Sequence, residues 1–173
     1  MTSIGASAFR DTNLTTVVIP SSVTSIGDSA FEDTQLTILH TIHLSPGWNM
    51  ISIPGNPVNT DPQALVGDSQ TIILPLYWWN PERFTYTPVS KLQVGQAYWI
   101  LALSPEGEDI TLLIEPLASL SLELKPGWNM IGGLQQSVTM TYGSENPSGS
   151  IVPQTLYSWN ASMFTYQPQT ILE

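Results

Sequence analysis

The sequence predicts a mainly β protein, in which a short N-terminal repeat segment packs on an antiparallel β sandwich or barrel built from two repeats that start at residues 44 and 124. Three observations lead to this expectation. β-prone runs alternate with turn-forming Gly, Pro and Asn, whereas helical periodicity is scarce. One short motif recurs within the first part of the chain, and a longer motif recurs across the rest of it. We therefore predict three domains, at residues 1–43, 44–119 and 120–173.

The short motif occupies the N-terminus, where Thr2–Phe9 aligns with Thr24–Phe31. The β-prone run Leu14–Pro20 lies between the two copies and ends in a proline. A period of about 22 residues with one strand per unit falls in the range of leucine-rich repeats. Because Ser-Ile-Gly, Ala-Phe and Ile-Pro all recur in register, residues 1 to about 43 resemble the BspA-type leucine-rich repeat. That resemblance implies a short solenoid, with Asp-Thr standing where the family usually has Cys or Gly-Cys.

The long motif fills the rest of the chain. Three blocks recur without a gap: Leu44–Ile51 at Leu124–Ile131, Leu76–Asn80 at Leu156–Asn160, and Phe84–Pro88 at Phe164–Pro168. The first copy closes with Gly95–Ile100. The unit resembles the Gly-Trp-Asn … Gly-x-x-Tyr-Trp module of large bacterial and archaeal surface proteins. The resemblance implies an extracellular β module and no particular activity.

Turn-forming residues predict the individual elements of both copies. Hairpins are expected at residues 41–53, 77–88, 97–114 and 120–131, short helical turns at 6–10 and 28–33, and long connections at 54–70 and 138–154. A short helix is expected at Asp61–Val66, where Pro62 stands in the first turn.

Both termini look trimmed in the repeat register. The chain starts inside a short repeat, and Glu173 aligns with Gln93, just before the closing strand of the first copy. We therefore expect an unpaired sheet edge near Phe164–Leu172, which invites a strand from a neighbouring chain. The N-terminal repeat is also expected to lack a cap, because two leucine-rich repeats do not bury their faces alone. Either surface predicts a homodimer.

The composition excludes several classes of function. Four Lys and Arg against fourteen Asp and Glu give a net charge of −10, which disfavours nucleic-acid binding. The absence of cysteine excludes disulfides, thiolate zinc sites and a Cys nucleophile. No apolar run is long enough to span a membrane, and the N-terminus does not have the pattern of a signal peptide.

One acidic cluster is a candidate metal site. Glu106, Glu108 and Asp109 flank Gly107 in a turn, and Ca²⁺ prefers several oxygen ligands in such a turn. The alternative is a solvated hairpin tip, since the pattern is not an EF-hand loop and the second copy has no equivalent. His40 and His43 fall on opposite faces of a strand and make a poor metal pair. Apart from this Ca²⁺ alternative, we expect no cofactor.

The aromatic residues are the candidate binding residues. Alternation places Tyr77 and Trp79 on one face of a strand and Trp78 on the other, and the second copy has Ser158 in place of Trp78. A core position tolerates such a loss of volume poorly. We therefore expect Trp78 at the surface, where it stacks on a sugar with Tyr77 and Arg83 or packs against another part of the chain. Four tryptophans are expected in the core: Trp48, Trp79, Trp128 and Trp159.

These observations favour a non-catalytic interaction or structural module of a bacterial cell-surface or secreted protein, with a protein or a surface glycan as partner. The sequence has no Gly-x-Ser-x-Gly, no Gly-rich phosphate loop and no His-Glu-x-x-His, so no local motif predicts an enzyme. Two alternatives stay open. One is a carbohydrate-binding module that uses exposed aromatic residues, and the other is an enzyme with a pair of carboxylates.

Overall fold

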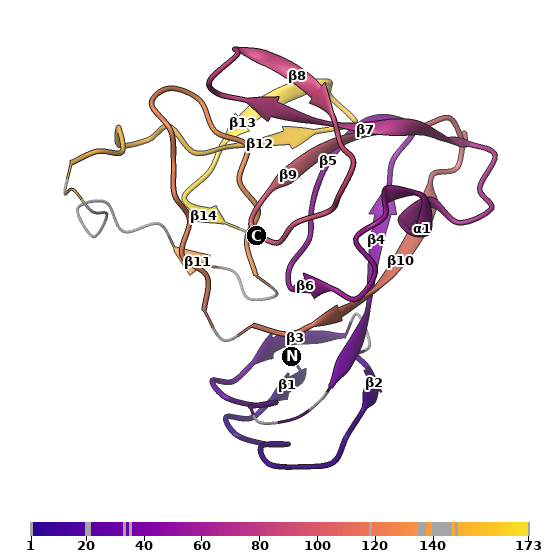
Figure 1. The fold of residues 1–173 in the computed structure, drawn as a ribbon, viewed down its shortest axis with the longest axis vertical. Helices are drawn as coiled ribbons and strands as arrows, with labels where there is room; N and C mark the ends of the chain where they lie inside the picture. The colour runs from indigo at the N-terminus through magenta and orange to yellow at the C-terminus, as the bar shows by residue number, and fades with distance from the viewer. Residues whose placement is uncertain are drawn as a thin grey trace.

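The structure is a computed structural model, and it describes residues 2–19, 22–32, 34, 36–117, 119–134, 138–139, 147 and 149–172. It is mainly β, as predicted (Figure 1). The N-terminal strands are β1 (Thr2–Ile4), β2 (Thr16–Val18), β3 (Val23–Ile26) and β4 (Thr37–Leu44). The middle of the chain forms β5 (Gly47–Ser52), β6 (Asn56–Pro57), α1 (Pro62–Val66), β7 (Ile72–Asn80), β8 (Thr85–Pro88), β9 (Ala97–Ala102) and β10 (Glu108–Glu115). The C-terminal part forms β11 (Val138–Thr139), β12 (Tyr157–Asn160), β13 (Thr165–Pro168) and β14 (Ile171–Leu172).

The N-terminal repeats lie one on the other at the narrow end of the molecule (Figure 1). β1 pairs with β3 and β2 pairs with β4, both in parallel. Backbone hydrogen bonds join residues about one repeat apart, such as Phe9 N–H to Ala30 O at 2.8 Å. The Phe9 and Phe31 rings stack with their centroids 5.4 Å apart. Equivalent residues of successive repeats therefore contact each other directly.

Strand β4 joins the repeats to the rest of the fold. Its residues Thr37–Leu39 pair in parallel with β2, and Ile38–Leu44 pair antiparallel with β10. The resulting sheet has the order β2-β4-β10-β6. The boundary that we predict at residue 43 thus falls inside a continuous strand.

A second four-stranded sheet has the order β5-β9-β7-β8. One buried hydrophobic cluster runs from Ala30 and Phe31 in the repeats to Ala102 in this sheet. Its fully buried large side chains are Leu36, Ile38, Leu44, Ile53, Leu76, Leu92, Tyr98, Ile100 and Ile114. The Tyr98 hydroxyl accepts the Gln93 N–H at 2.7 Å, and burial raises the pKa of Tyr98 to about 12.

Several predicted elements are confirmed. The hairpin at residues 77–88 forms as β7–β8, and the short helix forms as α1. The hairpins predicted at 41–53 and 97–114 are wrong, although their strands form: β4 pairs with β2 and β10, whereas β5 pairs with β9 in the other sheet. Asp61 caps α1, because its Oδ1 accepts the Gln63 N–H at 2.9 Å and Pro62 occupies the first turn. Residues 6–12 form hydrogen-bonded turns with i to i−3 bonds. Of the connection expected at 138–154, positions 140–146 and 148 lie outside the described residues.

The hairpin that we predict at residues 120–131 is wrong. Residues 119–130 contain no strand, and Ile131 makes only an isolated bridge to Gln96. In the first copy, β4 and β5 are held by β10 and β9, whereas the described residues offer no such partners to the second copy. The described part of the chain contains no helix that is long and apolar enough to cross a membrane.

The unpaired edge expected near Phe164–Leu172 is present only in part. β13 pairs with β12 alone among the described strands, so one of its edges is free. β14 is paired, because Ile171 and Leu172 lie opposite Thr139 and Val138. β8 is likewise the outermost strand of its sheet, so a free edge at this position is common to both copies.

Candidate interaction surface

The repeats present one exposed strand face. β2 is the edge strand of its sheet, and Thr16 and Val18 are exposed on either side of half-buried Val17. Val18 keeps 66% of its surface accessible, which is high for an apolar strand residue. An exposed edge of this kind offers both unpaired backbone groups and an apolar side chain to a partner.

Two aromatic hairpins form the opposite, broad end of the molecule (Figure 1). In β7–β8 the Trp79 ring meets Tyr86 edge-to-face at 5.2 Å, and in β12–β13 Trp159 meets Tyr166 at 5.3 Å. Phe84 and Phe164 complete the two sets, both with φ of 50°. Positive φ is strained for a bulky residue, so the same backbone conformation in both copies indicates a common constraint.

The second hairpin packs on the first copy of the long repeat. Trp159 Nε1 donates a hydrogen bond to the Trp48 carbonyl at 2.7 Å, and the Trp159 ring lies 5.0 Å from Trp99. A Cβ placed on Gly47 would lie 3.2 Å from Phe164 Cε1, and the φ of 94° at Gly47 also favours glycine at this contact. Burial together with the neighbouring Tyr86 hydroxyl raises the pKa of Tyr166 to about 12.

The reciprocal contact is looser. Phe84 is near Gly127, where an added Cβ would lie 3.8 Å from Phe84 Cε1. Trp79 Nε1, the counterpart of the Trp159 donor, is buried and has no hydrogen-bond partner among the described residues. Trp128, whose carbonyl would be the matching acceptor, has a 62% exposed side chain. The two copies therefore contact each other with similar residues but unequal geometry.

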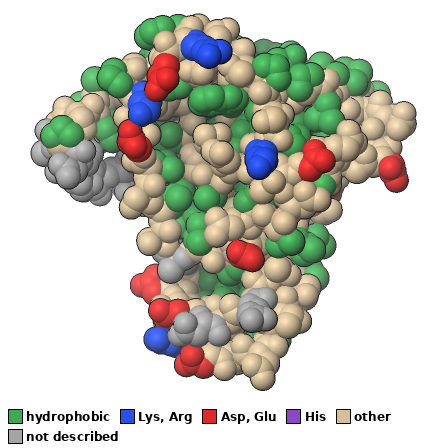
Figure 2. All heavy atoms as spheres, in the orientation of Figure 1, with side chains coloured by type: hydrophobic (Ala, Val, Ile, Leu, Met, Phe, Trp, Pro, Cys, Tyr) green, Lys and Arg blue, Asp and Glu red, His purple; other side chains and the backbone are tan. Residues whose placement is uncertain are grey.

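An open cleft of 370 Å³ lies beside Trp79. One wall consists of residues 78–82 and 94–96, and the other consists of residues 121–125 and 129–131. Sequence reasoning missed the second wall, although the long repeat identifies 124–131 as the counterpart of β5 and of the turn before it. Figure 2 shows that hydrophobic side chains are common over the broad end, with charged side chains of both signs scattered among them.

These surfaces can be compared with known proteins. Residues 1–53, here called the BspA type region, match the BspA type leucine rich repeat region. The family model spans six copies, and the match covers the two repeats, β4 and β5. BspA type repeats occur in bacterial surface proteins and are typically non-catalytic. Neither a curated protein nor a solved structure matches the chain.

The three predicted sugar-binding residues lie outside the BspA type region and do not share one face. Trp78 is half-buried and packs against the hydrophobic core, and it also lines the cleft. Tyr77 points to the other side, where its ring meets Trp48 at 6.3 Å. Arg83 is exposed in the turn after β7. The structure thus places only Trp78 at the cleft.

The expected core tryptophans need a correction. Trp48 is 40% exposed and Trp128 is 62% exposed, and Trp79 and Trp159 are half-buried outside the main core. The predicted core side of the sheet is the wrong one, because the side with Trp48 and Tyr77 meets other aromatic rings instead of the core. The Trp-to-Ser difference between the copies predicts the opposite arrangement, with Trp78 away from the core.

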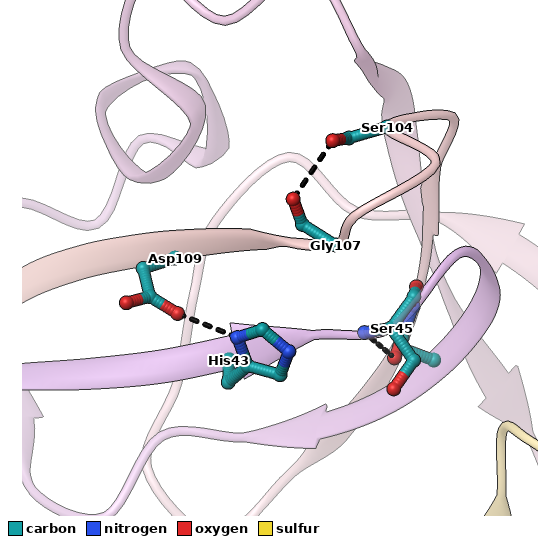
Figure 3. Close-up of polar contacts among 6 residues, drawn as sticks. His43, Ser45, Ser104, Gly107 and Asp109 are labelled. Carbon is teal, nitrogen blue, oxygen red and sulfur yellow. Dashed lines mark hydrogen bonds and ion pairs between the residues drawn. The ribbon is translucent and has the colours of Figure 1, made fainter.

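The acidic residues do not converge on a metal site. Asp109 pairs with His43 across β4 and β10 at 2.7 Å (Figure 3). Glu108 accepts a hydrogen bond from the Thr71 hydroxyl, and this bond, with a second from Ser69, lowers the pKa of Glu108. Glu106 is exposed at the turn. In the described part of the chain, no group of three or more His, Cys, Asp or Glu side chains could hold a metal ion.

Proposed function

We propose that the chain is a non-catalytic protein-interaction module of a bacterial cell-surface or secreted protein. The observation that carries this proposal is the match of residues 1–53 to a repeat family of bacterial surface proteins. The exposed edge strand β2 supplies the binding face, with Thr16 and Val18 directed outward. The net charge of −10 fits a protein partner better than a nucleic acid.

The test is an array of purified extracellular proteins probed with the labelled chain. A Thr16→Lys/Val18→Lys variant places two charges on β2, and we expect it to lose the signals of the parent chain. Val152→Lys is the matched control, because Val152 is 67% exposed and lies far along the chain from β2. Signals that survive in the β2 variant, or the absence of any signal from the parent, would contradict the proposal.

A carbohydrate-binding module is the second candidate. It is favoured by the cleft beside Trp78 and by the exposed rings of the two hairpins, since aromatic faces stack on sugars. We expect soluble polysaccharides to quench tryptophan fluorescence and Trp78→Ala to abolish the effect. Arg83→Ala tests whether Arg83 adds to binding. Equal quenching of the parent and the Trp78→Ala variant would count against a sugar site at the cleft.

A further inference from the structure

A second open groove, of 270 Å³, runs along strand β10 and is here called the β10 groove. Residues 111–113 of β10 line it, together with Leu39 of β4, Ala64 of α1 and Val58. Figure 1 shows α1 beside β10, and the two elements are in contact. The groove therefore has β10 beneath it, β4 on one side, and α1 with Val58 on the other.

The middle of the β10 groove is apolar. Every second residue of Ile110–Ile114 is buried in the core, so the residues between them face outward. Leu113 is one of these and is 41% exposed, and Leu39 lies opposite it in β4. Val58 is 53% exposed and donates its backbone N–H to the Leu113 carbonyl at 2.9 Å. Three apolar side chains from three segments thus form one exposed patch.

Acidic side chains stand at both ends of this patch. Asp109 and Glu115 are exposed and face outward with Leu113, because an even number of positions separates each of them from it. They are six positions apart, which corresponds to about 20 Å along a strand. Asp109 pairs with His43, whereas Glu115 makes no ion pair within the described part of the chain. A partner would therefore meet an apolar patch between two carboxylates.

The size and the charge of the groove indicate its occupant. Sites for small molecules usually have volumes of about 300–1,000 Å³ and enclose most of the ligand. An open groove of 270 Å³ fits an apolar side chain of a polypeptide better. Basic residues on either side of that side chain would complement the two carboxylates. On the α1 side, Lys91 and Asp61 are both exposed and carry opposite charges, so they do not alter this balance.

We propose that the β10 groove binds an extended segment of another protein in which one apolar residue lies between two basic residues. The apolar residue packs on Leu113. One basic residue, two positions away, lies opposite Glu115, and the other, four positions away on the other side, lies opposite Asp109. The segment therefore has the pattern basic-x-apolar-x-x-x-basic, read in either chain direction. The site does not rest on the function proposed for β2, because β4 separates β2 from β10 in the sheet.

A library of random peptides displayed on phage tests the proposal without a known partner. Selection on the immobilised full chain should enrich peptides with basic residues two and four positions from an apolar residue. The most enriched peptide, labelled with a dye, should bind the chain in solution by fluorescence anisotropy. Its affinity should fall as the salt concentration rises, because salt screens the charge pairs. No enrichment, or an enriched pattern without the two basic residues, would overturn the proposal.

A pair of lysine variants locates the binding site of the selected peptide. Leu113→Lys fills the groove and adds a charge that repels the basic peptide, so it should weaken binding about tenfold or more. Ile73→Lys is the matched control, because Ile73 is 40% exposed and also lies in a strand, but in the other sheet. It should leave the affinity unchanged. A Leu113→Lys variant that binds the peptide as tightly as the parent would overturn the proposal.

An exchange of charges tests one end of the groove and does not require the Leu113→Lys variant to fold. Glu115 is exposed, so Glu115→Lys leaves the core intact. It should weaken binding of the selected peptide about threefold, the scale of an exposed ion pair. A peptide with Glu in place of the basic residue two positions from the apolar one should recover this loss on the Glu115→Lys variant. Equal affinities in all four combinations would contradict the placement opposite Glu115 and overturn the proposal.

Discussion

Position 78 shows how a single residue is adapted to its copy of the repeat. Trp78 and Val89 both pack against the core, and their counterparts are Ser158 and Gln169. In the second copy Gln169 Nε2 donates a hydrogen bond to Ser158 Oγ at 2.8 Å. An apolar pair is thus replaced by a polar pair. The two positions change together in the sequence, and this paired change favours packing of Trp78 within the chain over its exposure at the surface.

Trp78→Ser should destabilise the protein by about 3 kcal/mol, because it removes a large side chain that packs on the core. The measurement is urea unfolding followed by circular dichroism. Adding Val89→Gln recreates the pair of the second copy and should recover part of the loss. A single variant as stable as the parent would show that Trp78 does not support the core.

His40 makes the stability depend on pH. It is half-buried in β4, and burial lowers its pKa from 6.5. Below pH 6.5 the unfolded chain therefore takes up a proton that the folded chain resists, so stability falls as the pH drops through 6.5 towards the lower folded pKa. We expect His40→Gln to reduce this fall in urea midpoints between pH 7.5 and 5. An unchanged pH profile would assign the fall to other groups.

At the scale of elements, comparison of the two copies shows which structures depend on the local sequence and which depend on contacts with distant parts of the chain. Asn49 and Asn129 make the same turn, each accepting a backbone N–H four residues earlier at 3.0 Å and donating to that residue's carbonyl at 2.8 Å. The hairpins β7–β8 and β12–β13 are also alike. Such turns and hairpins could be predicted from the sequence, because their residues interact with near neighbours.

Strand formation after the turn could not be predicted in the same way. Residues 47–51 and 127–131 have the same sequence, Gly-Trp-Asn-Met-Ile, yet only the first forms a strand. β5 depends on β9, which is distant in the chain. The pairing partner, and not the local pattern, decides the outcome. The cleft and the facing of the tryptophans depend on the same distant contacts, so sequence reasoning placed them wrongly or missed them.

The equivalent asparagines give a matched pair of variants. Asn49 is 7% exposed and makes its hydrogen bonds within a strand-flanked turn, so Asn49→Ala should cost about 2 kcal/mol. Asn129 makes the same bonds in an exposed segment, and Asn129→Ala should cost less than about 1 kcal/mol. Differential scanning calorimetry gives both values. Equal losses would indicate that the second turn supports the fold as strongly as the first.

At the scale of the whole molecule, the core is continuous from the two N-terminal repeats to the β5-β9-β7-β8 sheet. Ile4, Phe9, Leu14 and Val17 are half-buried and pack against this core. The mainly β class and the repeat register were predictable, because both follow from sequence patterns. The continuity of the core could not be predicted from the sequence, because it depends on the pairing of β4 with β10, a strand that comes much later in the chain.

The expectation of a homodimer through the N-terminal repeat stays a prediction. Light scattering over a range of protein concentrations measures the molar mass in solution, and we expect this mass to double as the concentration rises. Thr2 and Ser3 belong to β1, whose only described partner is β3. Replacing Ser3 with Pro should block pairing of a second chain at this edge. A constant monomer mass at high concentration would contradict the prediction.

Strand β4 also determines how the protein would respond to mechanical load. Ile38, at the beginning of β4, lies opposite Ile114, near the end of β10. Suppose that force is applied to the chain before β4 and after β10. Both points of attachment then lie at the same end of the β4–β10 pair, so the force separates the two strands from that end. The ladder would open pair by pair from Ile38–Ile114 towards Leu44–Glu108, as a zipper does, instead of resisting as a whole in shear. A surface-anchored chain with this connection would yield at low force and lengthen gradually under flow.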